Sequence, residues 1–263
     1  DYKRVQFTAD SVPSDITGFS VYEKHTGQFV YKPGAAMTNL LLADEINRTS
    51  SKTQSALLEV MEERQTTVDG VTRKLPEPFI VLATQNPIGS AGTQMLPDSQ
   101  MDRFMIKLGM GYPDLKSQIN ILKDRHRRNP LDEINMITGR EQLIKMQEAA
   151  DAVYIADSVY EYIARLADAT RRNEMIQLGI SPRGTLALCR MAKAYAFVTG
   201  RTFVIPEDVS AVFNDVCGHR IIVSPKAKIA ERKAEDILAD ILRTEPVPQI
   251  RQENATGAEG KKR

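Results

Sequence analysis

Two adjacent carboxylates follow an apolar run near residue 40. The run Leu40–Ala43 has the composition of a buried strand, and Asp44 and Glu45 come directly after it. Neighbouring side chains of a strand point in different directions, so one acid could support a Mg²⁺ ion while the other orients a water molecule. A buried strand can also end in acids simply to meet solvent, and these residues alone leave that interpretation open. The pair predicts a nucleotide-hydrolysing site at the end of a strand.

The elements that must position these acids are strands separated by helical or irregular segments. This alternation predicts an α/β domain, a three-layer core with a largely parallel sheet. The predicted strands are Val5–Thr8, Asn39–Ala43, Phe79–Thr84 and Phe104–Leu108. A helix over Lys52–Arg64, capped by Thr49 or Ser50, should follow the acidic strand.

Two segments of the same domain have the pattern of β-hairpins. Phe19–Tyr31 turns at Lys24–Gly27, and Thr66–Leu75 turns at Asp69–Gly70. We expect both hairpins to project from the core without building the sheet. They could contact a client or be surface loops with no such role.

Beyond Tyr112 the pattern changes to successive helices. These predict a small all-α domain joined by a helical linker. The predicted helices are Leu115–Arg127, Arg140–Ala149, Asp157–Asn173, Pro182–Thr199 and Glu207–Cys217. The predicted domains are 1–112 (α/β core), 113–130 (linker), 131–243 (α-helical) and 244–263 (a loose, basic tail).

Composition narrows the function classes. The 263 residues carry 35 basic and 34 acidic side chains, a formal charge of +1, which gives no support to nucleic-acid binding. Cys189 and Cys217, with three scattered histidines, form no zinc-like spacing and no disulfide framework. No stretch approaches the roughly twenty apolar residues of a membrane span, so a cytoplasmic protein is expected. Because Asp1 stands almost inside a strand-like segment, we expect the sequence to begin within a domain.

Several motifs occur in one order along the chain. They are Phe7-Thr8, Pro13-Ser-Asp-Ile-Thr-Gly18, Leu41-Leu-Ala-Asp-Glu-Ile-Asn-Arg48, Lys52-Thr-Gln54, Ala83-Thr-Gln-Asn-Pro87, Leu96-Pro-Asp-Ser-Gln-Met-Asp-Arg-Phe104 and Ser181-Pro-Arg183. Together, over roughly residues 4–223, they resemble the MoxR family of AAA+ ATPases. The resemblance implies an AAA+ core with an α-helical lid, and a ring, commonly a hexamer, that uses ATP and Mg²⁺. It also implies a chaperone-like or maturation role beside partners with von Willebrand factor A domains.

The resemblance also assigns roles to residues. Asp44 and Glu45 match the Walker B pair, with Asp44 supporting Mg²⁺ and Glu45 orienting the attacking water. Asn86 matches sensor 1, Arg103 the arginine finger that a neighbouring subunit receives, and Arg183 the sensor 2 arginine. ATP would therefore meet Asp44, Asn86 and Arg183. Taken alone, Asn86 before a proline could be a turn residue, and Arg183 a surface residue of a first helical turn. Arg103 could instead form a salt bridge with Asp98 or Asp102.

One family motif is absent. No Gly-x-x-x-x-Gly-Lys-[Ser/Thr] occurs, although this loop supplies the N–H groups and the lysine that bind phosphates. In the family it precedes the segment with which this sequence begins, so we expect truncation and, for this sequence as it stands, weakened ATP binding. The alternatives are a non-catalytic ring or partner-binding scaffold, and a metal-insertion ATPase like the magnesium chelatase subunits.

Overall fold

The computed structural model describes residues 1–86, 95–125 and 133–248. The chain divides into two compact units, which are described separately below. The first comprises Asp1–Phe104 and Leu108–Glu148, and the second comprises Met105–Lys107 and the chain from Ala149. The domain boundaries drawn from the sequence, after residues 112, 130 and 243, stay predictions.

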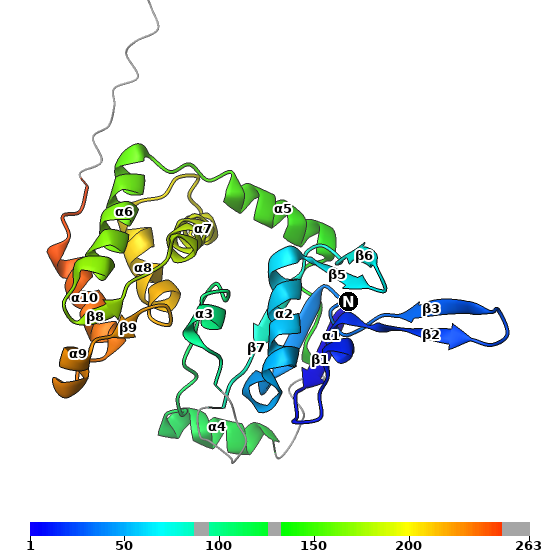
Figure 1. The fold of residues 1–263 in the computed structure, drawn as a ribbon. Helices are drawn as coiled ribbons and strands as arrows, with labels where there is room; N and C mark the ends of the chain where they lie inside the picture. Colours follow the sequence, from blue (N-terminus) through cyan, green and yellow to red (C-terminus); the bar gives the residue numbers. More distant parts are fainter. Residues whose placement is uncertain (87–94, 126–132, 249–263) are drawn as a thin grey trace, which may run out of the picture. The chain divides into compact units, whose positions relative to one another are not determined.

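A three-stranded parallel sheet forms the centre of the first unit (Figure 1). Its order is β1 (Tyr2–Gln6), β4 (Leu40–Asp44) and β7 (Ile80–Ala83), so β4 is the middle strand. The register pairs Gln6 with Asp44, and Ala43 with both Val5 and Ala83. Parallel strands end at the same edge of the sheet, which brings the residues that follow Asp44 and Ala83 together.

The two faces of the sheet differ in burial. Leu41 and Ala43 are fully buried on one face, where they share a core with Ile16 of α1 (Pro13–Thr17) and Leu57 of α2 (Ser51–Glu63). The opposite face carries Arg4 and Asp44, with Tyr2 and Leu82 each more than half exposed. Alternation along β4 therefore places Asp44 on the more open face of the sheet.

Helix α2 (Ser51–Glu63) confirms the predicted helix after the acids, and its N-cap is Ser50. The hydroxyl of Ser50 accepts the N–H of Thr53 at 3.3 Å, which satisfies one of the free donors of the first turn. Inward positions Leu57 and Leu58 are 0% and 2% exposed. Asp44 and Glu45 are therefore followed, after the 3-10 turn Ile46–Arg48, by a helix anchored in the core.

Both predicted hairpins are present as separate two-stranded antiparallel sheets. The first pairs β2 (Phe19–Glu23) with β3 (Gln28–Lys32) and extends away from the parallel sheet in Figure 1. The second pairs β5 (Gln65–Val68) with β6 (Val71–Lys74) around Asp69 and Gly70, which have φ of 50° and 75°. Left-handed φ at both turn residues favours this Asp-Gly pair.

The strand predicted at Phe104–Leu108 is wrong, because these residues form no strand. Ile106 packs against the core of the second unit, and the N–H of Lys107 donates to the carbonyl of Asp215 at 3.1 Å. The apolar pattern that suggested a strand thus marks a segment attached to the second unit. Three helices flank this segment in the sequence. Helix α3 (Asp98–Met101) precedes it, and α4 (Leu115–Arg125) and α5 (Arg140–Asp151) follow it.

The second unit is mainly helical, as predicted. Its elements are α6 (Asp157–Arg172), β8 (Ile176–Leu178), α7 (Pro182–Val198), α8 (Pro206–Cys217), β9 (Ile222–Val223), α9 (Pro225–Ile229) and α10 (Ala234–Thr244). Tyr162, Leu188, Phe213 and Leu238, from α6, α7, α8 and α10, are fully buried in one core. Strands β8 and β9 form a short antiparallel pair. Most of the predicted tail, residues 249–263, lies outside the described residues, as do residues 126–127 of one predicted helix.

Within the described ranges, no helix is both long and apolar enough to cross a bilayer.

Candidate active site

Asp44 is the last residue of β4, and two neighbouring strands supply its partners. The hydroxyl of Thr84 donates to Asp44 Oδ1 at 2.5 Å, and Arg4 Nη2 donates to Oδ2 at 2.6 Å. These two hydrogen bonds, the one from Thr84 first, hold the pKa of the Asp44 carboxyl below its usual range. Asp44 is therefore an anion near neutral pH, with 19% of its side chain exposed.

Glu45 leaves the strand with a left-handed backbone, φ 53° and ψ 46°. Such a conformation is uncommon for a residue other than glycine, and it costs on the order of 1–3 kcal/mol. Two hydrogen bonds to Thr84 hold it: the N–H of Glu45 donates to the hydroxyl at 2.9 Å, and the N–H of Ile46 donates to the carbonyl at 3.0 Å. The Glu45 carboxylate accepts a hydrogen bond from Arg48 Nη1 at 2.8 Å.

Asn86 lies beside the segment that follows the two acids. Asn47, which is fully buried, donates from Nδ2 to the carbonyl of Asn86 at 3.0 Å. In return, the N–H of Asn86 donates to Asn47 Oδ1 at 3.3 Å. These two hydrogen bonds fix the main chain of Asn86. Asn86 itself is exposed. The first unit therefore brings Asp44, Glu45 and Asn86 to one edge of the sheet.

Thr84 is the residue of this edge to which the sequence analysis gave no role. Its one hydroxyl contacts Asp44 and the main chain of Glu45, so it sets the geometry of both acids. Thr84 stands directly after the apolar strand β7, at the edge where Asp44 was expected. A hydroxyl at that position was the signal that could have identified it.

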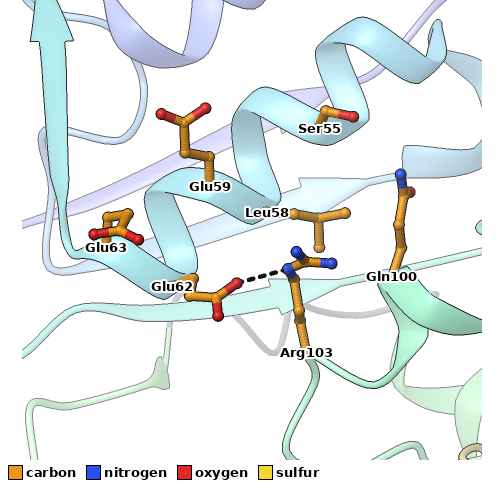
Figure 2. A pocket seen from close by; sticks show the side chains of 7 residues that line it. All are labelled: Ser55, Leu58, Glu59, Glu62, Glu63, Gln100 and Arg103. Atoms are coloured by element: carbon orange, nitrogen blue, oxygen red, sulfur yellow. Dashed lines mark hydrogen bonds and ion pairs between the residues drawn. The ribbon is translucent and has the colours of Figure 1, made fainter.

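Arg103 lies elsewhere in the first unit, just after α3, where it faces α2 (Figure 2). Its Nε donates to Glu62 Oε2 at 2.8 Å, and its Nη1 donates to the carbonyl of Ser99 at 3.2 Å. It lines a cleft of about 320 Å³ together with Gln100 and α2 residues. The α2 residues are Ser55, Leu58, Glu59, Glu62 and Glu63. An ion pair of Arg103 was expected as one possibility, although with Asp98 or Asp102; Figure 2 shows the pair with Glu62.

Arg183 belongs to the second unit, where it is the second residue of α7. Ser181 caps this helix through its hydroxyl, which accepts the N–H of Gly184 at 3.1 Å, and Pro182 is the first helical residue. Arg183 is exposed. The local sequence thus presents an arginine at the N-terminus of a well-capped helix.

The carboxylates of this edge fit a magnesium ion held with few protein ligands. Mg²⁺ prefers oxygen ligands, keeps several waters, and is usually bound through one or two carboxylates and substrate phosphates. Asp44 is anionic and partly exposed. Its Oδ2 accepts two hydrogen bonds from Arg4, whereas Oδ1 accepts one, from Thr84, and keeps a second lone pair for a metal-bound water. Over the described residues no group of three or more His, Cys, Asp or Glu could form a closed metal site.

Comparisons with known proteins decide the family. Residues 1–106 match the model of the ATPase family associated with various cellular activities (AAA), and residues 168–241 match the AAA lid domain. The chain is 38% identical over 258 residues to the chaperone MoxR1 of Mycobacterium tuberculosis, covering 95% of this chain and 68% of that protein. This chain belongs to the MoxR family of AAA+ ATPases. The family assignment made from the sequence motifs is confirmed.

Other relatives of this MoxR-family chain agree. It is 45% identical over 248 residues to the uncharacterised protein YeaC of Bacillus subtilis, covering 94% of this chain and 78% of YeaC. A crystal structure of a candidate ATPase from Cytophaga hutchinsonii matches 95% of this chain and 78% of its own, with a TM-score of 0.87 and 36% identity. The AAA+ fold, an α/β core with a parallel sheet and a helical lid, is thereby confirmed.

Proposed function

We propose that this chain forms the hydrolytic core and lid of an ATP-driven MoxR-type machine. The observation that carries the proposal is the pair of acids at the carboxyl edge of the sheet, both held by the Thr84 hydroxyl. Asp44 stays anionic and faces the more open side of the sheet, where it would support Mg²⁺ through water. When bound there, Mg²⁺ would neutralise charge on the ATP phosphates.

In this proposal Glu45 orients the attacking water. The Glu45 carboxylate is bound by Arg48, whereas that of Asp44 is bound by Thr84 and Arg4, so the two acids have different partners. Asn86 would hydrogen-bond that water or the γ-phosphate, since a neutral amide adds no negative charge to the site. The Asn47–Asn86 pair supports this role, because it fixes the main chain from which the Asn86 side chain extends.

Two arginines complete the proposed site from elsewhere. Arg103 would reach the γ-phosphate of a neighbouring subunit in a ring, which we propose to be a hexamer. Its side chain is 32% exposed and pairs with Glu62, itself 39% exposed, so this ion pair is open to exchange. Arg183 would contact the phosphates from the lid. ATP would therefore be bound by Asp44, Asn86 and Arg183.

The proposed output is chaperone-like remodelling of a client protein or of a partner with a von Willebrand factor A domain. The name of MoxR1 as a chaperone supports this direction. The β2–β3 hairpin offers a surface for contact, since Tyr22 and Phe29 are 53% and 74% exposed. The rings of these two residues lie 5.4 Å apart. ATP hydrolysis would drive a conformational change that acts on the client, and no new covalent bond would be formed in the client.

The test is Glu45→Gln in the full-length protein. The amide keeps the size of the side chain but cannot act as a base, so we expect ATP binding to persist and turnover to fall to background. Glu161→Gln, the same change at an exposed position of α6, serves as the control and should keep both properties. Turnover in Glu45→Gln equal to that of the control would refute the assigned role. No nucleotide binding by the unaltered protein would favour the partner-binding scaffold.

A further inference from the structure

A buried arginine in the lid has no role in the proposed hydrolysis. Arg220 follows α8 and is 6% exposed. Its Nη1 donates to the carbonyl of Met105 at 3.1 Å and also to the carbonyl of Val216. A buried guanidinium is costly unless its donors are satisfied, so these bonds fix the side chain in one place.

Arg220 is one of three attachments that hold residues 105–107 to the second unit. The N–H of Lys107 donates to the carbonyl of Asp215 on α8 at 3.1 Å. Between these two contacts, Ile106 packs against the core of the second unit. Three consecutive residues therefore belong to the lid, although they stand more than 40 positions before Ala149, where the rest of the lid begins.

The residues just before this segment are attached to the first unit instead. Phe104 packs against the core of the first unit, and Arg103 is bound to Glu62 at 2.8 Å. An extended chain spans at most about 3.6 Å per residue, so the Cα atoms of Arg103 and Met105 stay within about 7 Å of each other. A lid movement larger than a few ångströms must therefore displace Arg103 or break one of these attachments.

The other side of Arg220 contacts the helix that carries Arg183. A Cβ atom added at Gly184 would lie 2.8 Å from Arg220 Cδ and 3.3 Å from Nε. The stem of Arg220 therefore packs directly on the first turn of α7, one residue after Arg183. A shift of that turn would press on the side chain that holds Met105.

We propose that Arg220 is a positioning residue for Arg103, which couples the position of the arginine finger to the lid helix bearing Arg183. When nucleotide shifts the first turn of α7, Arg220 carries the movement to the carbonyl of Met105 and so to Arg103. This inference rests on the proposed function, because it needs nucleotide to reach Arg183. Arg220 would thus connect, within one subunit, Arg183, which contacts that subunit's own nucleotide, to Arg103, which acts on the nucleotide of the neighbouring subunit.

Hydrogen exchange on the full-length protein tests the coupling, with and without a non-hydrolysable ATP analogue and Mg²⁺. In the unaltered protein, nucleotide should change the exchange of peptides covering 182–198 and 98–107 together. Arg220→Met keeps most of the stem but has no guanidinium, so the change at 182–198 should remain while that at 98–107 is lost. Arg220→Lys, which can reach one carbonyl as a single ammonium, should retain part of the change and serves if the methionine variant does not fold.

Ile237→Val is the control, because it removes one methyl group from the lid core on α10 and should preserve both responses. Arg220→Met with both responses intact would overturn the inference, and so would loss of both, since that would show only a structural role. A response in the unaltered protein at 182–198 without one at 98–107 would also overturn it while leaving the proposed function standing. No response at either peptide would refute nucleotide binding, and the coupling with it.

Discussion

Replacing Thr84 by valine removes one hydroxyl and leaves the shape of the side chain unchanged. That hydroxyl donates to the Asp44 carboxylate at 2.5 Å and accepts the N–H of Glu45 at 2.9 Å. A hydrogen bond to a charged group contributes roughly 1.5–3 kcal/mol and a neutral one roughly 0.5–1.5 kcal/mol. Because the site is open to water, which can replace part of both, we expect the free energy of unfolding to fall by about 1–2 kcal/mol.

The same change should slow ATP turnover, because both acids lose the group that orients them. A loss of about 1–2 kcal/mol in positioning corresponds to a roughly 5- to 30-fold decrease in kcat. Thr84→Ser is the matched variant: serine keeps the hydroxyl but is a poorer strand former than valine. Urea unfolding and steady-state turnover should therefore rank serine above valine. Equal values for the two, or a more active valine variant, would refute the role of the hydroxyl.

Three further changes test other parts of the molecule. Arg103→Ala should lower turnover but change the free energy of unfolding by no more than about 1 kcal/mol, because its ion pair with Glu62 is exposed. If the arginine acts between subunits, mixing this variant with Glu45→Gln should restore part of the activity. A hydrogen bond from Arg232 holds the pKa of Asp240 below its usual range. The charged carboxylate therefore stabilises the lid at pH values above the ordinary aspartate pKa of about 3.9, and this contribution is lost as pH falls through the lowered pKa. In urea unfolding, the free energy of unfolding of Asp240→Asn should decrease less steeply with falling pH than that of the unaltered protein. Ser181→Ala removes the N-cap of α7 and should cost about 1 kcal/mol in lid unfolding, and an unchanged value would contradict the cap assignment.

Local patterns in the sequence predicted the local elements of this fold. The turn at Asp69–Gly70 specifies a hairpin, and the spacing of Leu57, Leu58 and Met61 specifies a helix, through contacts within a few residues. The meeting of Asp44 and Asn86 at one edge also follows from strands that end together. Such features need only the period of the chain and the geometry of a parallel sheet.

Long-range partners were beyond that reasoning. Arg4 and Thr84 each meet Asp44 across 40 residues of sequence, and nothing in their immediate neighbours announces the contact. Ile106 is apolar because it packs on the lid, so its segment reads like a strand until the partner is known. The periodicity of a single sequence indicates that a residue is buried, but it does not identify the element against which the residue packs.

The two hairpins share no hydrogen-bonded ladder with the parallel sheet, and each forms a sheet of its own. A hairpin can therefore gain or lose residues without shifting the strand register that brings Asp44 and Thr84 into contact. Doubling the length of a flexible loop costs only about 0.6 kcal/mol in closure entropy, which a domain of this size can absorb. Mutation can thus alter the exposed hairpins while the strands that position Asp44 and Thr84 stay unchanged. Under the proposed function, a change of client contacts on the hairpins would therefore cost the α/β core little stability.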